Sequence, residues 1–480
     1  MHGDSHVYRF GPFALDAGRR RLSRDRDPVW LPDRQLDVLL ILVANAGRIV
    51  SKDTLVDAAW QGMAVSDDSI FQVMTRLRTS LGSRQDGEPY VETLVRKGYR
   101  FVAPVDRGEP PPSTVSIDAL LEPYCAFVDG RAALETLDLE AIVGAREVFV
   151  EALRVNPAAP AAHIGMANAC ALAFESTRVD AEPDRAALAQ ADHHAREGCR
   201  LAPAQGDAWS TLAFVRHRHG DAREAVAAAR KAVALEPHNW RHHVRLAFVS
   251  WGEERLRAAY QVLALCPGQA LGHWFAATVF VAREAFDHAL EELRAGCASQ
   301  DAQCTDTGGF TAVGLHLLHG LVLAARGAVD EGLAEFEREL AFEHARHVYG
   351  RECAANTWYA IGALRLRQRR PDDAHAAFHE ALRRVPGHGL AIVGLATTSS
   401  GFPPVPERDE TSTVEAATVY AAVLAREGKH QEAACLCGEA LRQATMGSAG
   451  WMLPVEPLLH VTAHRDVWVR TLAMLRDRAA

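Results

Sequence analysis

The sequence predicts a mainly α-helical protein, with a small N-terminal α+β domain followed by an α-solenoid of helix pairs. Three observations support this fold class. Residues Val65–Phe101 combine an amphipathic helix with a basic hairpin, Glu109–Thr114 contains three prolines, and the chain beyond about Ile117 repeats a helix-pair pattern. With 480 residues and 48 % hydrophobic content, the chain is too long for one ordinary domain and can bury sizeable cores.

The first residues predict a small sheet followed by two helices. Apolar residues alternate or cluster between turn residues in four segments, which predict a four-strand meander: Val7–Phe10, Phe13–Leu15, Arg21–Ser23 and Val29–Leu31. Pro32 suits the first turn of a helix whose apolar stripe ends at Gly47. Ser51 caps a second helix, which buries Trp60 and ends at Gly62.

The stretch Val65–Leu81 predicts the helix around which this domain is organised. Its apolar residues recur at i, i+4, i+7 and i+11 and form one inward face: Ile70, Met74, Leu77 and Leu81. The opposite face is polar and cationic and carries Ser69, Gln72, Arg76 and Thr79. Further on, Tyr90–Phe101 has β-rich flanks around Arg96, Lys97 and Gly98, so two strands are expected to meet at a basic tip.

Dispersed positions between about Val7 and Val105 match a known family in order and spacing. They are Leu39-Leu40, Gly47–Lys52, Leu55, Trp60, Val65–Asp67, Arg76–Arg78, Leu81-Gly82 and Gly98–Phe101. This part of the chain resembles the winged helix-turn-helix DNA-binding domain of OmpR/PhoB-type transcriptional regulators. The resemblance implies an N-terminal four-stranded sheet, three helices and a hairpin wing, with the last helix in the major groove of DNA and the wing at a neighbouring minor groove.

The resemblance also implies which side chains would contact double-stranded DNA. Four would face base edges or their rim: Ser69, Gln72, Val73 and Arg76. Three would hold phosphates: Thr75, Arg78 and Thr79. Arg96 and Lys97 would lie in or over the minor groove. Many family members carry basic or large polar residues where this chain has Phe71, Val73 and Thr75, which predicts sparse base readout.

The charge of the chain is unevenly distributed. Residues 1–107 hold 16 Lys and Arg against 14 Asp and Glu, a net charge of +2, and the remainder holds 36 against 47, a net charge of −11. Because +2 is a weak field for a DNA-binding domain, the attraction to phosphates must come from clusters. The basic clusters are Arg19–Arg26, Arg76 with Arg78, and Arg96, Lys97 and Arg100.

The chain beyond the winged helix predicts tetratricopeptide repeats. One set of positions fits the 34-residue pattern: Trp209, Leu212, Ala213, Gly220, Ala225, Ala229, Ala232 and Pro237. A second set fits it in the same phase: Trp358, Ile361, Gly362, Ala374, Phe378, Ala381 and Pro386. We therefore predict three parts: a winged-helix domain at 1–107, a proline-rich linker at 108–117, and a repeat solenoid at 118–480 with a C-terminal capping helix.

A repeat array of this kind curls into a superhelix whose concave face commonly binds another chain. Eight side chains are predicted to line that groove: Asp207, Ser210, Phe214, His217, Asn356, Tyr359, Leu366 and Arg367. The predicted partners of the repeats are a protein such as RNA polymerase or a regulatory protein, a small effector, or another copy of the chain in a homodimer.

The sequence offers no starting point for an enzyme, and no cofactor is expected. It contains no phosphate-binding Walker loop, no dinucleotide fingerprint and no GxSxG motif. His316 and His319 at i, i+3 could share a metal, but no acid or cysteine near them in the sequence completes a zinc pattern, so no metal site is predicted. Nine cysteines without a CxxC pair favour reduced, mostly buried thiols.

Apolar runs are far shorter than the roughly 20 residues needed to cross a bilayer, and no signal-peptide core is present, so we expect a soluble cytoplasmic protein that does not bind membranes. The domain order resembles HilA-like soluble bacterial regulators. It implies a sequence-specific transcription factor whose repeats bind a partner. The alternative is a tetratricopeptide scaffold or adaptor whose winged helix docks a protein.

Overall fold

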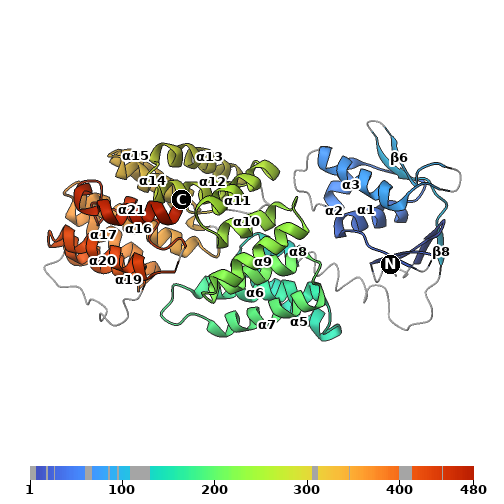
Figure 1. Ribbon diagram of the computed structural model, residues 1–480, viewed down its shortest axis with the longest axis horizontal. Coiled ribbons are helices and arrows are strands. Elements are labelled where there is room, and N and C mark those ends of the chain that lie inside the picture. Colours follow the sequence, from blue (N-terminus) through green and yellow to red (C-terminus); the bar gives the residue numbers. More distant parts are fainter. Residues whose placement is uncertain are drawn as a thin grey trace. The chain divides into compact units, whose positions relative to one another are not determined.

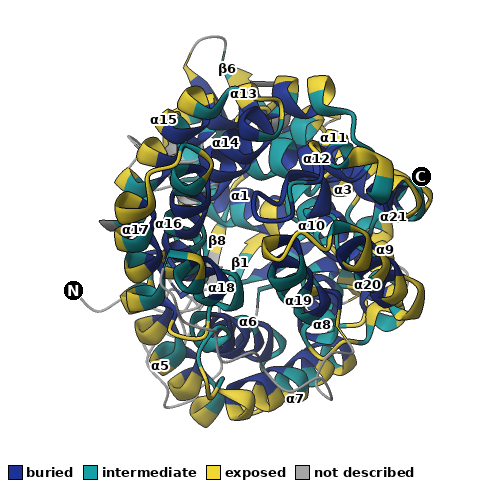
Figure 2. Ribbon diagram, turned by 90° about the vertical axis from the view of Figure 1, so that its left-hand side faces the viewer, coloured by how far each residue is buried: buried dark blue, intermediate teal, exposed yellow. Residues whose placement is uncertain are grey.

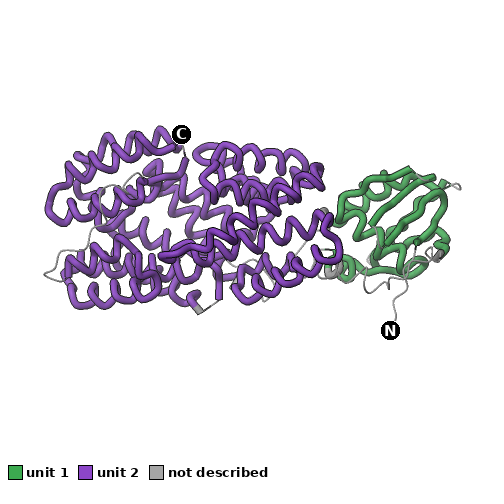
Figure 3. Tube along the Cα trace, turned by 90° about the horizontal axis from the view of Figure 1, so that it is seen from below, with its two compact units in different colours: residues 1–126 green, residues 127–480 purple. Residues whose placement is uncertain are grey.

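A computed structural model describes residues 7–17, 20–25, 27–59, 67–84, 87–94, 97–108, 130–304, 312–344, 346–398, 413–445 and 447–480. The chain divides into two compact units, residues 1–126 and 127–480 (Figure 3). Residues 109–117 of the predicted linker lie outside the described part.

The first unit begins with an antiparallel sheet. Four consecutive strands form a meander: β1 Val7–Phe10, β2 Phe13–Asp16, β3 Arg21–Arg24 and β4 Asp27–Val29. A fifth strand, β8 (Asp106–Gly108), pairs antiparallel with β1, which gives the order β4-β3-β2-β1-β8. The predicted four-strand meander is confirmed, and β8 adds a fifth strand that the sequence did not indicate. Strand β8 is too short and polar to be recognised alone, and it forms because the edge of β1 offers unpaired backbone groups.

Three helices and a second small sheet complete the unit. They are α1 Asp33–Ala44, α2 Lys52–Ala59, α3 Asp67–Leu81, β5 Ile49–Val50, β6 Val91–Leu94 and β7 Gly98–Phe101. Strands β6 and β7 form the predicted hairpin, and β5 pairs with β7. The N–H of Thr54 donates to the Ser51 hydroxyl at 3.0 Å, which confirms Ser51 as the cap of α2. Trp60 and Gly62 lie outside the described residues.

An aromatic cluster holds the two sheets and the helices of the first unit together. Phe10 lies edge-on to Phe101, with ring centroids 5.0 Å apart, and Tyr90 lies edge-on to Phe13 at 5.6 Å. The apolar stripes of α1 and α3 pack into the same core. Because these rings come from β1, β2, β7 and the residue before β6, the hairpin is fixed to the N-terminal sheet.

The second unit is an α-solenoid of tetratricopeptide-like helix pairs (Figure 1). Residues 130–135 are also helical. Among the helices whose bounds are described, the first are α5 Leu139–Val155, α6 Pro160–Thr177, α7 Arg185–Leu201, α8 Gly206–Arg218, α9 Ala222–Leu235, α10 Trp240–Val249, α11 Gly252–Leu265, α12 Ala270–Ala282, α13 Phe286–Cys304 and α14 Leu315–Ala325. The others are α15 Val329–Leu340, α16 Gly350–Arg367, α17 Pro371–Arg384, α18 Gly389–Thr398, α19 Val414–Arg426, α20 His430–Gln443 and α21 Arg465–Ala479, with short 3-10 turns η1 at Ala341–His344 and η3 at Leu453–Val455.

Successive helices pack as antiparallel pairs, including the two that the sequence singled out, α8 with α9 and α16 with α17. Small residues allow the close approach: Ala213, Ala225 and Ala229 are fully buried between α8 and α9. Figure 2 shows exposed residues on the outer sides of α5, α7, α15 and α17, and buried residues on the faces turned toward their partner helices. The array is thus held together by one stripe of buried residues on each helix, which packs against the neighbouring helices.

A glycine on α16 sets the spacing of its pair, which makes a testable prediction. A methyl group at Gly362 would lie 2.6 Å from Cε1 of Phe378, a fully buried ring of α17. We expect Gly362→Ala to lower the free energy of unfolding by about 1–3 kcal/mol, because the ring has no room to move without overpacking. Urea denaturation followed by circular dichroism measures the change.

The matched control for this substitution is Gly144→Ala. Gly144 lies within α5, and a methyl group there would meet nothing within 4 Å. This variant should gain roughly 0.5–1 kcal/mol from the better helix propensity of alanine. If both glycines tolerate alanine equally, the close approach of α16 and Phe378 does not limit stability.

Candidate nucleic-acid interface and repeat interior

Helix α3 has one buried face and one open face, as predicted. Its buried side chains are Ile70, Met74, Leu77 and Leu81, none of them more than 2 % exposed. The exposed side chains on the other face are Gln72, Thr75, Arg76 and Thr79, with Val73 half-buried beside them. The side chain of Ser69 lies outside the described part of the helix. The predicted DNA-contacting residues that can be placed on α3 therefore share the solvent side, apart from Arg78.

The two threonines on the open face are already hydrogen-bonded. The Thr75 hydroxyl donates to the Phe71 carbonyl at 2.8 Å, and the Thr79 hydroxyl donates to the Thr75 carbonyl at 3.0 Å. A phosphate oxygen accepts hydrogen bonds, so either hydroxyl would have to leave its carbonyl in order to hold one. The predicted role of these threonines thus requires a local rearrangement.

Arg78 is directed at the hairpin rather than at the open face. Its Nε donates to the Val91 carbonyl at 3.0 Å, and its Nη2 donates to the Thr93 hydroxyl at 2.6 Å. Both partners belong to β6, so this guanidinium fastens the hairpin to α3. That Arg78 also holds a phosphate stays a prediction, since Nε and Nη2 of its guanidinium already position the hairpin.

The hairpin tip depends on a glycine. Gly98 has a φ of +126°, and a methyl group there would lie 2.1 Å from the Val50 carbonyl oxygen. Only glycine fits this approach of β7 to β5. The adjoining Lys97 is exposed and donates its backbone N–H to the Leu94 carbonyl at 2.9 Å, which closes the turn. Arg96, the other predicted tip residue, lies outside the described residues.

Most of the other basic residues of this unit have intramolecular partners. Arg20 Nη1 lies 2.6 Å from Asp37 Oδ1, and Arg100 Nη2 lies 2.6 Å from Glu92 Oε2. Arg24 stacks over the Phe13 ring. Arg76 and Lys97, by contrast, are exposed and have no ion-pair partner within the described part of this unit. These two cations are available for an anionic ligand such as DNA.

Exposed aromatic side chains are a feature that the apolar stripe did not predict. Phe71 on α3 is 61 % exposed, and Trp30, between β4 and α1, is 74 % exposed. Phe71 falls outside the i, i+4 series of the buried face. This position in the sequence could have indicated that its ring is exposed. A large apolar group on the open face of α3 adds a contact surface that charge and hydrogen bonding do not provide.

The predicted groove of the repeats is largely filled by the chain itself. Three of its eight predicted residues are in the core: Ser210 is 8 % exposed, Phe214 2 % and Tyr359 4 %. The expectation that they project into an open groove is wrong. Phe214 lies edge-on to Phe248 of α10, and the Tyr359 hydroxyl donates to Glu456, so neighbouring parts of the array cover these side chains.

An early segment contacts the array about 200 residues further along the chain. The N–H of Leu139 donates to the Arg346 carbonyl at 2.9 Å, and the N–H of Val348 donates to the Leu137 carbonyl at 2.8 Å. The residues after α20 contact the middle of the array. Trp451 lies edge-on to Trp274 with centroids 6.0 Å apart. Segments far apart in the chain are therefore in contact within the array.

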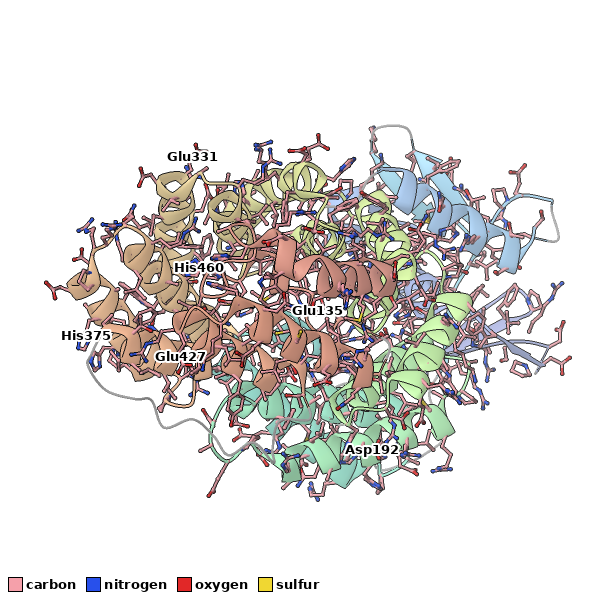
Figure 4. The ribbon with its side chains drawn as sticks, turned by 60° about the vertical axis from the view of Figure 1, so that its left-hand side comes forward. Glu135, Asp192, Glu331, His375, Glu427 and His460 are labelled. Carbon is pink, nitrogen blue, oxygen red and sulfur yellow. The ribbon has the colours of Figure 1, made fainter. Side chains whose placement is uncertain are left out.

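The remaining predicted groove residues are mostly engaged with neighbours. Asp207 accepts from Arg131 at 2.8 Å, His217 packs against Phe248, Asn356 bonds to His388 at 2.9 Å, and Leu366 packs on the core. Arg367 is exposed and lies beside a small pocket of about 30 Å³ that His460 also lines. Figure 4 shows Glu135 and His460 within the outline of the array, and Glu331 and His375 at its edge. A wide ligand groove is not formed by these residues.

The structure also places a cysteine and an acid beside the histidine pair. Cys297 and Glu335, from the helices on either side of α14, come within ligand distance of His316. The sequence showed no sign of this grouping, because ligands from separate helices have no fixed spacing in the sequence.

The fold of the first unit, with a helix packed on a sheet and a hairpin beside it, defines a winged helix-turn-helix. Residues 26–101 match the family described as "Transcriptional regulatory protein, C terminal". This domain is an OmpR/PhoB-type winged helix, as the sequence predicts. The chain is also similar to the transcriptional regulator HilA of Salmonella typhi, at 39 % identity over 90 residues, which covers 19 % of this chain and 16 % of HilA.

Solved structures resemble each unit separately. The DNA-binding domain of Escherichia coli CadC covers 22 % of this chain and all of its own length, with 26 % identity and a TM-score of 0.20. A tetratricopeptide repeat protein from Parabacteroides merdae covers 57 % of this chain and 99 % of its own length, with 14 % identity and a TM-score of 0.39. Among the described helices, none combines the length and apolar content needed to cross a membrane.

Proposed function

We propose that this protein is a sequence-specific DNA-binding transcriptional regulator, with α3 in the major groove and the β6–β7 hairpin at the minor groove. The observation that carries the proposal is the open face of α3, where Gln72 and Arg76 stand exposed on a helix whose other face is fully buried. The family matched by residues 26–101 and the regulator HilA support the same function.

In this proposal, separate side chains read bases, contact the DNA backbone and hold the hairpin. Arg76, exposed and unpaired within the described residues, reads guanine, and Gln72 one turn earlier reads adenine. Lys97 contacts the backbone at the minor groove. Arg78 contributes indirectly by holding β6 through Val91 and Thr93. Ser69, Thr75, Thr79 and Arg96 remain predicted contacts.

Phe71 provides the apolar part of the recognition. Its exposed ring lies on α3 immediately before Gln72, and the C5-methyl group of thymine is the apolar feature of the major groove. Base readout in this protein would then depend on a pyrimidine methyl contact where other members of the family use polar side chains.

A binding experiment tests the function. Duplexes selected from a random library by the full-length protein are measured by fluorescence anisotropy at two salt concentrations. We expect Arg76→Ala to weaken binding by about 1–3 kcal/mol and to blur the preference over scrambled DNA. Lys97→Ala should reduce the slope of log affinity against log salt by about 1 and leave the sequence preference unchanged.

The matched control is Arg257→Ala, which removes an exposed arginine from α11 of the repeat unit. It should bind the selected duplex like the wild type. If the library yields no enriched sequence, or if the Arg76 and Arg257 variants behave alike, the proposed DNA interface is wrong.

The rival function is a scaffold whose winged helix docks a protein, and the exposed Trp30 favours it because large exposed aromatics mark protein contacts. In either case we propose that the repeats bind a protein partner, an effector or a second copy. Because most of the predicted groove residues already contact other parts of the chain, such binding would use the outer faces of the repeats. If a Trp30→Ala variant binds DNA normally but no longer changes transcription from the bound promoter, both the open face of α3 and the surface around Trp30 are used.

A further inference from the structure

Three neighbouring helices of the repeat unit bring together side chains that typically bind metal ions. Cys297 of α13, His316 of α14 and Glu335 of α15 each place one ligand atom so that the three atoms lie within 4.8 Å of one another. Cys297 and His316 are buried, at 5 % and 0 % exposure. They are separated by about 20 residues along the chain, so only the packing of two repeats assembles them.

A second histidine and a second acid border the same cluster. His319 Nδ1 lies 3.3 Å from Glu335 Oε2 and 3.9 Å from Cys297 Sγ. His316 Nδ1 lies 2.6 Å from the same Glu335 oxygen, and its Nε2 lies 3.1 Å from Asp301 Oδ1. The Nε2 atom of His319 is buried without a hydrogen-bond partner in the described structure. It is the Nδ1 atom of His319, and not this Nε2, that faces Glu335 and Cys297.

We propose that Cys297, His316, His319 and Glu335 bind one divalent transition-metal ion of the zinc type. A thiolate, two imidazoles and a carboxylate form a ligand set that suits zinc, whereas calcium and magnesium prefer oxygen ligands alone. In a tetrahedral site with such ligands, neighbouring ligand atoms lie about 3.3–3.8 Å apart. The 3.3 Å contact between His319 Nδ1 and Glu335 Oε2 fits this spacing. The 2.6 Å contact between His316 Nδ1 and Glu335 Oε2 must widen, and His319 must move in from the border of the group of three, when the metal binds.

Metal binding requires the loss of one proton from the site. The Cys297 thiol must release its proton to solvent as the metal–sulfur bond forms, while the imidazoles bind in their neutral form. Burial raises the pKa of this thiol, and the nearby Glu335 and Glu339 carboxylates act in the same direction. A bound cation reverses both effects, because it stabilises the thiolate and offsets the acidic charge.

Neighbouring residues hold the ligands in position. The Glu339 carboxylate accepts from the N–H groups of Gly314 at 2.7 Å and Leu317 at 3.2 Å, and the Gln300 side-chain oxygen accepts from the N–H of Leu315 at 3.2 Å. The first turn of α14, which carries His316 and directly precedes His319, is thus fastened to α13 and to α15. Such supporting hydrogen bonds orient the ligands before a metal arrives.

The inference goes beyond DNA binding and does not depend on it. A metal held by three helices would join the α12/α13 pair to the α14/α15 pair. Because the ligands are assembled only in the folded array, the bound metal stabilises the folded state by mass action. The repeat unit would then unfold at a higher temperature when the metal is present.

Cobalt titration of the full chain tests the site. The reduced protein is treated with a chelator, desalted and titrated with Co²⁺, which reports a thiolate ligand by charge-transfer absorption in the near ultraviolet. We expect saturation at one equivalent, displacement by one equivalent of Zn²⁺, and a higher unfolding temperature with Zn²⁺. Cys297→Ser should lose the charge-transfer band, and Glu335→Gln should weaken zinc binding at least tenfold.

Two control variants test whether a histidine–carboxylate pair or a thiol elsewhere in the chain can account for the metal binding. Glu292→Gln alters a histidine–carboxylate pair with the same local geometry, since His273 Nδ1 lies 2.7 Å from Glu292 Oε2, but Cys297 is not among its partners. Cys435→Ser removes an exposed thiol on α20. Both variants should bind cobalt like the wild type.

The inference is overturned if the wild type shows no charge-transfer band, and this result needs no variant. It is also overturned if Cys297→Ser, with a circular-dichroism spectrum like that of the wild type, keeps the band and the stoichiometry. If Cys297→Ser does not fold, His319→Gln replaces it, and unchanged zinc affinity in that variant contradicts the assignment of four ligands.

Discussion

Replacing Glu175 with alanine is expected to lower the free energy of unfolding of the repeat unit by about 3–5 kcal/mol. Glu175 lies near the end of α6, and its side chain is fully buried. Arg218 Nη2 donates to its Oε2 at 2.7 Å, Arg218 Nε lies 2.6 Å from its Oε1, and Arg178 Nε lies 3.6 Å from Oε2. Removing the carboxylate leaves the Arg218 guanidinium, which is 18 % exposed, without its anion.

The effect should extend beyond α6 because the network connects distant helices. Arg178 also pairs with Glu352 of α16, and the hydroxyl of Tyr349, just before α16, bonds to Glu175. Denaturant unfolding followed by tryptophan fluorescence measures the loss. The control is Glu151→Ala, whose carboxylate pairs with Arg154 on the solvent side of α5 and should leave the midpoint unchanged.

A double substitution distinguishes the charge from the packing. If the penalty comes from an unpaired buried arginine, Glu175→Leu combined with Arg218→Met should recover most of the stability lost in Glu175→Ala. If the double variant is as unstable as the single one, the loss reflects a cavity or a displaced helix, and the ion pair does not account for it.

The second large effect is a pH dependence that resides in one carboxyl group. Glu456 is buried behind η3, where the Tyr359 hydroxyl donates to it and the N–H of Leu458 donates to its Oε1 at 3.1 Å. Burial raises the pKa of Glu456 to about 7, although both hydrogen bonds act in the opposite direction. The folded protein therefore holds a proton on Glu456 at pH values where the unfolded chain has released it.

The direction of the effect follows from proton linkage. Below the unfolded pKa of 4.5, both states are protonated and Glu456 contributes no pH dependence. As the pH rises from there to about 7, the unfolded state ionises first, so the folded state loses stability, and above about 7 the loss is complete. At 1.36 kcal/mol per pKa unit, the full effect is about 3 kcal/mol.

Thermal unfolding of wild type and Glu456→Gln between pH 5 and pH 8 measures this contribution. Glutamine can accept the same two hydrogen bonds but does not ionise. We expect the two proteins to have similar stability near pH 5 and the Gln variant to be the more stable one at pH 8. Parallel profiles across this range would show that Glu456 is ionised in the folded protein or that its burial is relieved by local opening.

The winged helix was predicted well because the features that define it involve residues close together in the sequence. The buried face of α3, the serine cap of α2 and the tip glycine at Gly98 each follow from spacing or from a backbone conformation that few residues adopt. The strand β8 was not predicted, since Asp106–Gly108 has no apolar alternation and pairs only because β1 is available beside it.

The role of Arg78 shows the limit of a positional argument on the candidate interface. Its place one turn from Met74 and next to Leu77 gave no indication that its guanidinium turns back to Val91 and Thr93. Long side chains can reach either face of a helix, and the choice depends on which carbonyls and hydroxyls lie nearby. Phe71 is exposed because it lies outside the series Ile70, Met74, Leu77 and Leu81 that forms the buried face of α3.

The sequence by itself determined the helix pairs and the winged helix, because a hydrophobic period of 3.6 residues, small contact residues and turn glycines act over a few residues. Only the tertiary structure decided that Ser210, Phe214 and Tyr359 are buried, that Leu139 pairs with Arg346, and that Cys297 and Glu335 meet His316. Those contacts join residues that lie about 20 to 200 positions apart, and no periodicity records which surfaces meet after the array has curled.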